Sequence, residues 1–273
     1  MEEEYYLRDL TVNDWEKFNE MEKEIFPEEP IREETFRNGL SSLRALSVVM
    51  IHKETKEFIG YYRIGIYGNL GHIYRIGVHP NYRRKGYGSI LLEKSMFQLK
   101  KAGCNKFFLY VKEYNEAAIN LYRKFHYDIE TKSWQFIIPY KKLPQEPRGR
   151  CRHIEWGEIQ LMTLRFNLNP HQIQQYFTRE NQHVMIYENM GQQLGFCRFD
   201  PTFPGAMPFI IKDPEYVLDF VSILKSYITN PEFDSVKITF DGQENLVNKL
   251  VKEKFKINYN LLRMNRSVKI EDK

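Results

Sequence analysis

The residues best suited to chemistry lie in residues 78–89, where three consecutive cations, residues 83–85, precede Gly86 and Gly88. The stretch follows an apolar segment typical of a strand and opens a long amphipathic segment typical of a helix. The first N–H groups of a helix have no internal acceptor and lie at the positive end of its dipole. The stretch therefore predicts a site for a diphosphate group, or else an ordinary helix start with solvated Arg and Lys side chains.

The two glycines have separate uses in such a site. Gly86 can adopt backbone conformations that other residues avoid, and Gly88 lets a phosphate approach the backbone closely. A second stretch, residues 115–127, begins with Asn115 and carries Tyr122 on a predicted helix. The two stretches read V-x-P-x-Y-R-x-K-G-x-G and N-x-x-A-x-x-L-Y-x-K-x-x-Y.

In these two motifs and in the order of its predicted elements, the segment of residues 3–140 resembles the GNAT superfamily of acetyl-CoA-dependent N-acetyltransferases. The resemblance implies an α/β fold with a mixed sheet, in which acetyl-CoA lies between two parallel strands that splay apart. These strands are predicted at residues 72–78 and 106–111. The implied reaction is acetyl transfer from acetyl-CoA to a primary amine by direct attack in a ternary complex.

The resemblance also implies roles for individual residues. The cofactor-binding residues would be Ile76, Val78, Arg83, Arg84, Lys85, Gly86, Tyr87, Gly88, Ser89 and Asn115. Tyr122 stands where the family keeps the group that protonates the departing thiolate. A phenol has a pKa of about 10, so Tyr122 is protonated at neutral pH and able to donate; the alternative is an aromatic residue that only packs a helix face.

The attacking amine must be neutral, so a general base is expected. His72 is the first candidate, because it begins the strand that would hold the cofactor and its side chain titrates near neutral pH. It is equally well explained as a residue at a strand start after a turn. Glu113 is a second candidate, or a solvated carboxylate. Glu28 and Glu29 lie where the family binds acceptors, and either attract a cationic substrate or form a polar loop.

Periodicity and turn residues predict the elements that must position these side chains. In the first half, strands are expected at residues 5–7, 46–51, 58–67, 72–78, 106–111 and 127–138, and helices at 13–26, 33–40, 86–102 and 115–125. In the second half, strands are expected at residues 158–166, 183–187, 194–199, 207–211, 236–240 and 257–264, and helices at 170–179, 215–228 and 244–254. Asn13 and Asn169 are the expected helix caps.

The repeated order of elements predicts two GNAT-like domains, each a mostly antiparallel sheet with a central splayed parallel strand pair flanked by helices. The expected boundaries are residues 1–140 for the catalytic domain, 141–155 for a proline-rich linker and 156–273 for a degenerate domain. An offset of 128 residues pairs Phe255 with Tyr127, and Leu250 with Tyr122. The same offset sets Pro214, Tyr216 and Gln243 against Gly86, Gly88 and Asn115. The second half would thus lack both the cofactor loop and the acid.

Composition gives no support for a nucleic-acid-binding, membrane or secreted protein. The 273 residues include 40 Lys and Arg against 36 Asp and Glu, a net charge of +4 that gives no reason to expect a nucleic-acid partner. No apolar run approaches the roughly 20 residues of a membrane helix, and residues 1–4 are unlike a signal peptide. We therefore expect a cytoplasmic monomer or homodimer that acts on a small-molecule or peptide amine, with neither nucleic acid nor membrane as partner.

Cysteine and histidine spacing adds an expected absence. The three cysteines, Cys104, Cys151 and Cys197, include no C-x-x-C pair, and the seven His include no H-E-x-x-H motif. Neither a disulfide framework nor a metal site is expected. Two other functions remain open from sequence: a non-catalytic acyl-CoA-binding or sensing protein, and a structural protein on an inactive GNAT scaffold. The joint presence of the loop and Tyr122 favours the enzyme, because a sensor needs only the loop.

Overall fold

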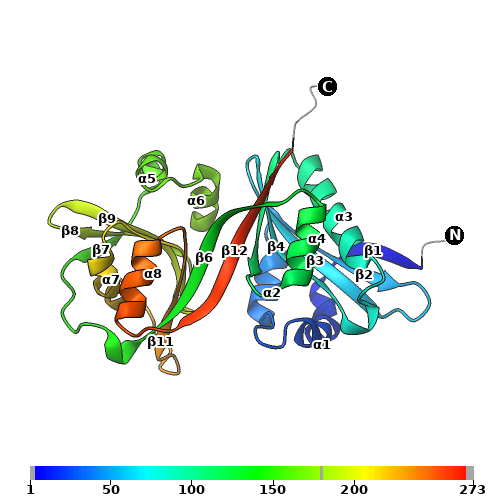
Figure 1. The fold of residues 1–273 in the computed structure, drawn as a ribbon, viewed down its shortest axis with the longest axis horizontal. Helices are drawn as coiled ribbons and strands as arrows, with labels where there is room; N and C mark the ends of the chain where they lie inside the picture. Colours follow the sequence, from blue (N-terminus) through cyan, green and yellow to red (C-terminus); the bar gives the residue numbers. More distant parts are fainter. Residues whose placement is uncertain (1–3, 179–180, 269–273) are drawn as a thin grey trace. The chain divides into compact units, whose positions relative to one another are not determined.

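The computed structural model of the chain describes residues 4–178 and 181–268 (Figure 1). The chain divides into two compact units. The first contains the residues up to Tyr110, Glu116–Asp128 and the residues from Met264 onward, and the second contains Val111–Asn115 and Ile129–Arg263. The predicted boundaries at residues 140 and 156 therefore differ from the compact units, because each unit includes a short segment from the other half of the chain.

The first unit is built on a sheet with the strand order β1-β2-β3-β4-β5. All of these neighbours pair antiparallel except β4 and β5, which are parallel. The strands are β1 (Tyr5–Asp9), β2 (Ala45–His52), β3 (Phe58–Tyr67), β4 (Leu70–Val78) and β5 (Lys106–Lys112). The helices are α1 (Trp15–Ile25), α2 (Glu33–Leu40), α3 (Tyr87–Lys101) and α4 (Glu116–Lys124).

The second unit repeats this plan with the strand order β6-β11-β10-β9-β8-β7, in which only β10 and β11 are parallel. Its strands are β6 (Asp128–Pro139), β7 (Arg150–His153), β8 (His183–Asn189), β9 (Gln192–Asp200), β10 (Gly205–Ile211), β11 (Ser235–Asp241) and β12 (Ile257–Ser267). Its helices are α5 (Ile159–Phe166), α6 (Pro170–Phe177), α7 (Val217–Lys225) and α8 (Glu244–Lys252). The prediction of an α/β mixed sheet in two repeats, each with one central parallel strand pair, is thus confirmed.

Strand β12 contributes to both units. Its first residues, up to Arg263, belong to the second unit, and the residues from Met264 onward belong to the first. Beyond the strand, the Val268 N–H donates to Asn105 O at 2.8 Å. The Arg266 guanidinium donates to Phe125 O at 2.8 Å, where helix α4 has just ended. The first unit is therefore completed by residues from the far end of the chain.

Two sequence predictions are wrong in the second half. The predicted strand at residues 158–166 is instead helix α5 (Ile159–Phe166), because Ile159, Met162 and Phe166 recur at helical spacing and all three are buried. The predicted linker, residues 141–155, contains strand β7, which pairs with β8, so that part of it belongs to the sheet.

The predicted helix caps had opposite outcomes. Helix α6 begins as predicted, with the Asn169 side chain accepting from Gln172 N–H at 3.0 Å, and its predicted end at Arg179 lies outside the described residues. Asn13 is not a cap, because it lies inside a short 3-10 turn that Thr11 and Asp14 close reciprocally.

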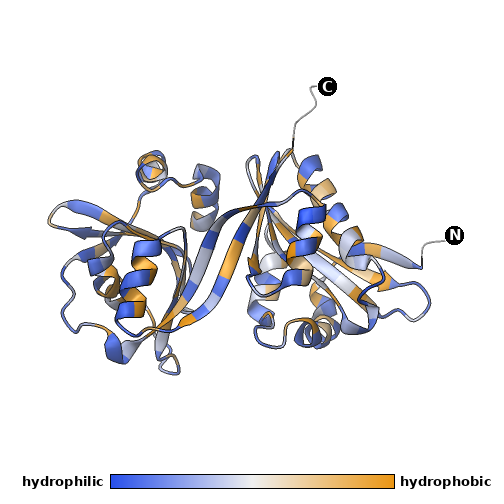
Figure 2. Ribbon diagram, in the orientation of Figure 1, coloured by the Kyte–Doolittle hydropathy of each residue, from blue (hydrophilic) through white to orange (hydrophobic). Residues whose placement is uncertain are grey.

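Each unit has its own apolar core, formed where helices cover a sheet face. In the first unit, α1 and α2 place Phe18, Met21 and Phe36 on buried residues of β2 and β3. In the second unit, Phe220 and Leu250 from α7 and α8 pack in a cluster with Phe136 and Phe209. Figure 2 shows apolar and polar residues alternating along these helices, as expected for elements with one buried face.

The parallel strands part midway in both units. In the first unit, β4 and β5 pair from Leu70↔Lys106 to Ile73↔Leu109, and the pairing ends there. Tyr74 is an extra residue in β4, because Arg63 pairs with Arg75 while Ile64 pairs with Ile73. A bulge bends its strand and strengthens the local twist, so the bulge at Tyr74 accounts for the separation.

Candidate functional site

The part of β4 beyond the bulge offers its backbone to a ligand. Ile76 and Val78 pair on one side with Tyr62 and Gly60 of β3. On the other side, the register with β5 has already ended at Ile73. A strand edge of this kind accepts an extended chain through main-chain hydrogen bonds. The structure therefore places the predicted pair, Ile76 and Val78, on the edge where the two parallel strands have parted.

The loop between β4 and α3 has the left-handed backbone that its glycine predicts. Gly86 is the N-cap of α3 with φ of 86°, and Arg84 also has a positive φ of 64°. A Cβ on Gly86 would meet no atom within 4 Å, so this position is open as well as left-handed. The Ser89 N–H bonds to Gly86 O at 3.0 Å, so the N–H groups of Tyr87 and Gly88, which precede it in α3, are the ones suited to an anion.

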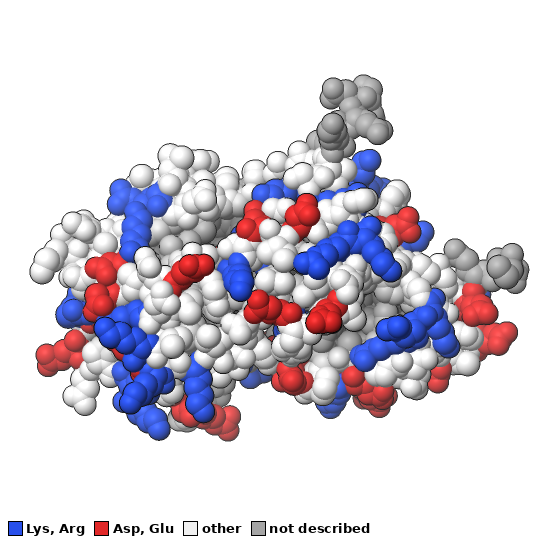
Figure 3. Space-filling model, in the orientation of Figure 1, with Lys and Arg blue, Asp and Glu red and all other residues white. Residues whose placement is uncertain are grey.

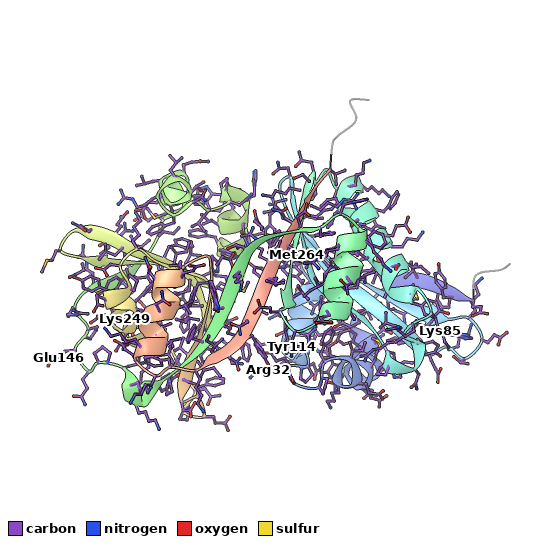
Figure 4. The ribbon with its side chains drawn as sticks, in the orientation of Figure 1. Arg32, Lys85, Tyr114, Glu146, Lys249 and Met264 are labelled. Carbon is purple, nitrogen blue, oxygen red and sulfur yellow. The ribbon has the colours of Figure 1, made fainter. Side chains whose placement is uncertain are left out.

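The three cations of the loop are all exposed, but their contacts differ. Arg83 donates from Nε to Val78 O at 3.1 Å, which ties the loop to the end of β4. Lys85 Nζ lies 5.4 Å from the centre of the Tyr82 ring. Figure 4 labels Lys85. Figure 3 shows basic and acidic side chains intermingled on the face that it draws, with no extended basic surface there. The positive charge needed for a diphosphate is thus local to the loop.

Helix α4 meets the loop beside Gly88. A Cβ on Gly88 would lie 3.4 Å from Leu121 Cδ2 and 3.9 Å from Val78 Cγ2. The next residue, Tyr122, is 6% exposed, and burial raises the pKa of its phenol above the ordinary value. The end of β4, the start of α3 and the helix that carries Tyr122 are therefore neighbours, and Tyr122 is protonated throughout the neutral range.

His72 lies among aromatic rings at the last paired residues of β4. Its ring stacks on Phe108 with 4.1 Å between centroids, and the Tyr74 ring is 4.3 Å away. The Tyr110 ring, 5.8 Å away, closes the group, and His72 is 9% exposed. The His72 imidazole is therefore held in one orientation close to the bulge where β4 and β5 separate.

The remaining predicted residues lie in other surroundings. Glu113 and Asn115 fall in the second unit, where Glu113 forms an exposed ion pair with Lys132 at 3.2 Å. Such an ion pair suits a solvated carboxylate better than a base. Glu28 is exposed, and Glu29 is half-buried and accepts a hydrogen bond from Arg75 through its backbone oxygen.

A buried polar network beside this site was missed from sequence. Glu22 of α1 is 0% exposed and pairs with Arg75 Nε of β4 at 3.0 Å. Tyr61 of β3 donates its hydroxyl to the same carboxylate, and the Ile31 N–H donates to Glu22 Oε1 at 3.1 Å. Burial raises the pKa of Glu22, and these partners only partly offset that rise.

The network fixes the segment between α1 and α2 to β4. The Arg75 guanidinium lies 4.1 Å from the centre of the Phe26 ring and donates to Glu29 O, while Glu22 accepts from Ile31 N–H. A buried ion pair of this kind contributes more to orientation than to stability. The sequence did hold a signal: Glu22 follows Phe18 by one helical turn, so the periodicity of α1 places a carboxylate on its apolar face.

The second unit differs at the positions that correspond to the predicted site residues of the first. Helices α4 and α8 end alike. After α4, His126 has a positive φ and the backbone N–H of Tyr127 donates to Tyr122 O. After α8, Lys254 has a positive φ and the backbone N–H of Phe255 donates to Leu250 O. This match confirms that the buried Leu250 stands in the place of Tyr122. The predicted partner of Gly88 needs correction, because Tyr216 is the N-cap of α7 and so corresponds to Gly86. Its φ is −101°, and the left-handed cap is lost.

The described residues contain neither a cluster of metal-binding side chains nor a helix suited to a membrane. No group of three or more His, Cys, Asp or Glu side chains within residues 4–178 and 181–268 is placed to hold a metal ion. Among the helices of the same residues, none combines the length and the apolar character needed to cross a membrane. The three cysteines are free, with Cys104 and Cys197 buried.

Comparison with known proteins agrees with this geometry. Residues 8–127 match the family model of the acetyltransferase (GNAT) family. An acetyltransferase of Pectobacterium atrosepticum is 36% identical over 72 residues, which are 26% of this chain and 51% of the relative. The chain spans about half the length of the curated relatives it matches.

Solved structures share the fold over the whole chain. The crystal structure of a proposed acetyltransferase from Pyrococcus horikoshii has a TM-score of 0.73 at 17% identity and covers 100% of this chain and 92% of its own. A tandem GNAT protein from the clavulanic acid biosynthesis pathway has a TM-score of 0.66 at 11% identity and covers 98% and 100%. Residues 8–127 therefore match the GNAT family model, and the chain as a whole shares the two-unit fold of these solved structures.

Proposed function

We propose that the first unit is an N-acetyltransferase that moves the acetyl group of acetyl-CoA to a primary amine. The observation that carries the proposal is the convergence of three features in one unit. The edge of β4 is released beyond Ile73, the loop at Gly86 presents the start of α3, and Tyr122 is buried on the adjacent helix. The second unit lacks the last two features, which favours the first unit as the site of chemistry.

The residues fit the parts of the co-substrate in turn. The N–H groups at the start of α3 and the charges of residues 83–85 suit the diphosphate. The backbone of Ile76 and Val78 suits the amides of the pantetheine arm, which has the hydrogen-bonding groups of an extended peptide. When the amine nitrogen attacks the thioester carbonyl, a C–N bond forms, the C–S bond breaks, and sulfur must gain a proton.

Tyr122 is proposed to supply that proton. A phenol whose pKa is raised by burial keeps its proton at neutral pH, so Tyr122 is in the protonated form that can donate to the departing sulfur. His72 is proposed to take the proton that the amine nitrogen loses, because an imidazole can accept a proton near neutral pH and the His72 ring lies beside the Tyr74 ring at the bulge on β4. The acceptor class stays a primary amine of a small molecule or peptide.

The test uses the full-length chain and separates binding from turnover. Calorimetry with acetyl-CoA measures binding, and release of free thiol with a panel of primary amines measures transfer. Tyr122→Phe should bind acetyl-CoA as the parent does and lose about 100-fold in kcat, the lower range for general acid catalysis. Binding without turnover for any amine would instead support a sensing protein, and absence of binding would remove the proposal.

The chain offers a matched control for Tyr122. Tyr127 is also buried, its ring lies 6.1 Å from the Tyr122 ring, and its hydroxyl has no hydrogen-bond partner within the described residues. Tyr127→Phe removes the same atom from the same surroundings and should leave kcat unchanged. His72→Gln should remove the acidic limb of the pH–rate profile; if the limb persists in that variant, the base is another group.

A further inference from the structure

The second unit contains a groove that corresponds to the cofactor edge of the first. Strands β10 and β11 pair only at Gly205↔Lys237 and Ala206↔Ile238. A shift of register between Ala206 and Phe209 marks a bulge in β10, as at Tyr74 in β4. Beyond these bulges the parallel strands have parted in both units.

The antiparallel neighbours of the two strands set the correspondence. In the first unit Val78 pairs with Gly60 and Ile76 with Tyr62. In the second unit Ile211 pairs with Gly195, and Phe209 pairs with Cys197, two residues further along β9. Phe209 and Ile211 are therefore the counterparts of Ile76 and Val78, whose backbone is proposed to bind the pantetheine arm.

The side chain of Gln243 bonds to both of these residues. Its Oε1 accepts from the Ile211 N–H at 2.9 Å, and its Nε2 donates to Phe209 O at 2.9 Å. Gln243 is the N-cap residue of α8, yet its side chain does not cap that helix. The carboxamide instead donates one hydrogen bond and accepts one on the edge of β10. It therefore bonds to β10 as a backbone amide of a neighbouring strand would.

We propose that Gln243 is an internal occupant of the second unit's cofactor groove and is the group that keeps pantetheine-type amides off β10. A carboxamide presents one donor and one acceptor, the same pair that an amide of the pantetheine arm presents. Beside Gln243 a pocket of about 370 Å³ remains, lined by residues that include Lys212, Pro214 and Asn245. A pocket thus remains beside Ile211, while the main-chain groups on the edge of β10 are bonded to a side chain of the same unit.

The proposal rests on the proposed function in one respect, the binding of pantetheine to β4 in the first unit. The probe is pantetheine itself, which lacks the diphosphate and so does not need the loop that the second unit has lost. Amide resonances of the isotope-labelled full-length chain report the units separately, Ile76 and Val78 for the first and Ile211 for the second. The variant is Gln243→Ala.

In the parent chain, millimolar pantetheine should leave the Ile211 amide unchanged. In Gln243→Ala, the Ile211 amide should exchange with solvent about fivefold faster, as expected for loss of one hydrogen bond, and pantetheine should shift its resonance and slow that exchange. Gln135→Ala is the matched control, because the Gln135 side chain contacts Thr239 and Asn258 within the same unit. It should behave as the parent does.

Two results would overturn the proposal. In the first, pantetheine changes neither the resonance nor the exchange rate of the Ile211 amide in Gln243→Ala. In the second, pantetheine changes them equally in the parent chain. Should the alanine variant unfold, Gln243→Ser keeps a good N-cap residue for α8 but has a side chain too short to replace both bonds to β10, so it is read by the same criteria. If pantetheine shifts the amide resonances of Ile76 and Val78 in none of the proteins, the proposed function fails. The test of Gln243 is still read from the Ile211 amide.

Discussion

Replacing Gly86 by Ala tests whether the left-handed turn before α3 holds an anion. Gly86 has φ of 86°, and a Cβ there would meet no atom within 4 Å, so the change adds strain without a clash. Placing an L-residue in this region costs about 1–2 kcal/mol. If the free loop relaxes and the bound loop cannot, acetyl-CoA affinity falls by that free energy, about 5- to 30-fold.

Gly103 provides the matched control at the other end of the same helix. It has φ of 87°, and its missing Cβ also faces open space. Gly103→Ala should lower the urea midpoint of the first unit by the cost of its backbone strain, and Gly86→Ala should lower it less, because its free loop relaxes. Only Gly86→Ala should weaken binding of acetyl-CoA in calorimetry.

Equal losses of affinity in the two variants would mean that general destabilisation, not the loop, controls binding. Unchanged affinity in Gly86→Ala would place the diphosphate elsewhere. Gly88→Ala gives an independent reading, because its Cβ fits at 3.4 Å from Leu121 Cδ2 and the fold should be preserved. We expect weaker binding from that variant as well, since the added methyl group stands where the phosphate approaches the backbone.

Two further predictions concern the stability of the first unit. Burial raises the pKa of Glu22 above the ordinary value of 4.5, so above pH 4.5 the folded state keeps a proton that the unfolded state has released. The free energy of unfolding should therefore fall as pH rises from 4.5 to the raised pKa of the folded state, and Glu22→Gln should remove this dependence. Parallel stability-against-pH curves for the two proteins would contradict the assignment. Deletion of the chain from Met264 onward should lower the melting temperature of the first unit, because it removes the hydrogen bonds of Arg266 to Phe125 O and of Val268 to Asn105 O. A differential scan that shows only the second unit destabilised would refute the assignment of these residues.

Local pattern predicted most of the elements, and the failures have physical causes. Helix Glu33–Leu40 and strand Phe58–Tyr67 have the predicted bounds, since proline, glycine and periodicity all agree there. The sequence predicts a strand at residues 158–166 because these residues are mostly apolar, but apolar runs of that length suit a helix equally well. What decides is the spacing of Ile159, Met162 and Phe166, which packs them in one cluster with α6.

Contacts between distant residues explain what the sequence could not predict. No local pattern shows that residues after Arg263 complete the first unit, because the partner of Val268 is Asn105. Likewise, the ion pair of Glu22 with Arg75 depends on α1 crossing β4. The loop at Gly86 was predictable for the opposite reason, since its glycines and cations adjoin one another along the chain.

The two units also show which features of the fold are independent of the proposed chemistry. Both have a bulge where the parallel strands part. In both, a residue with a left-handed backbone follows the helix after the second parallel strand, His126 after α4 and Lys254 after α8. A parted strand leaves main-chain groups that must find partners. The second unit supplies them from Gln243, so its groove needs no ligand to satisfy Phe209 and Ile211. Persistence of the groove is therefore a consequence of the fold, and only the loop and the buried tyrosine distinguish a site for transfer.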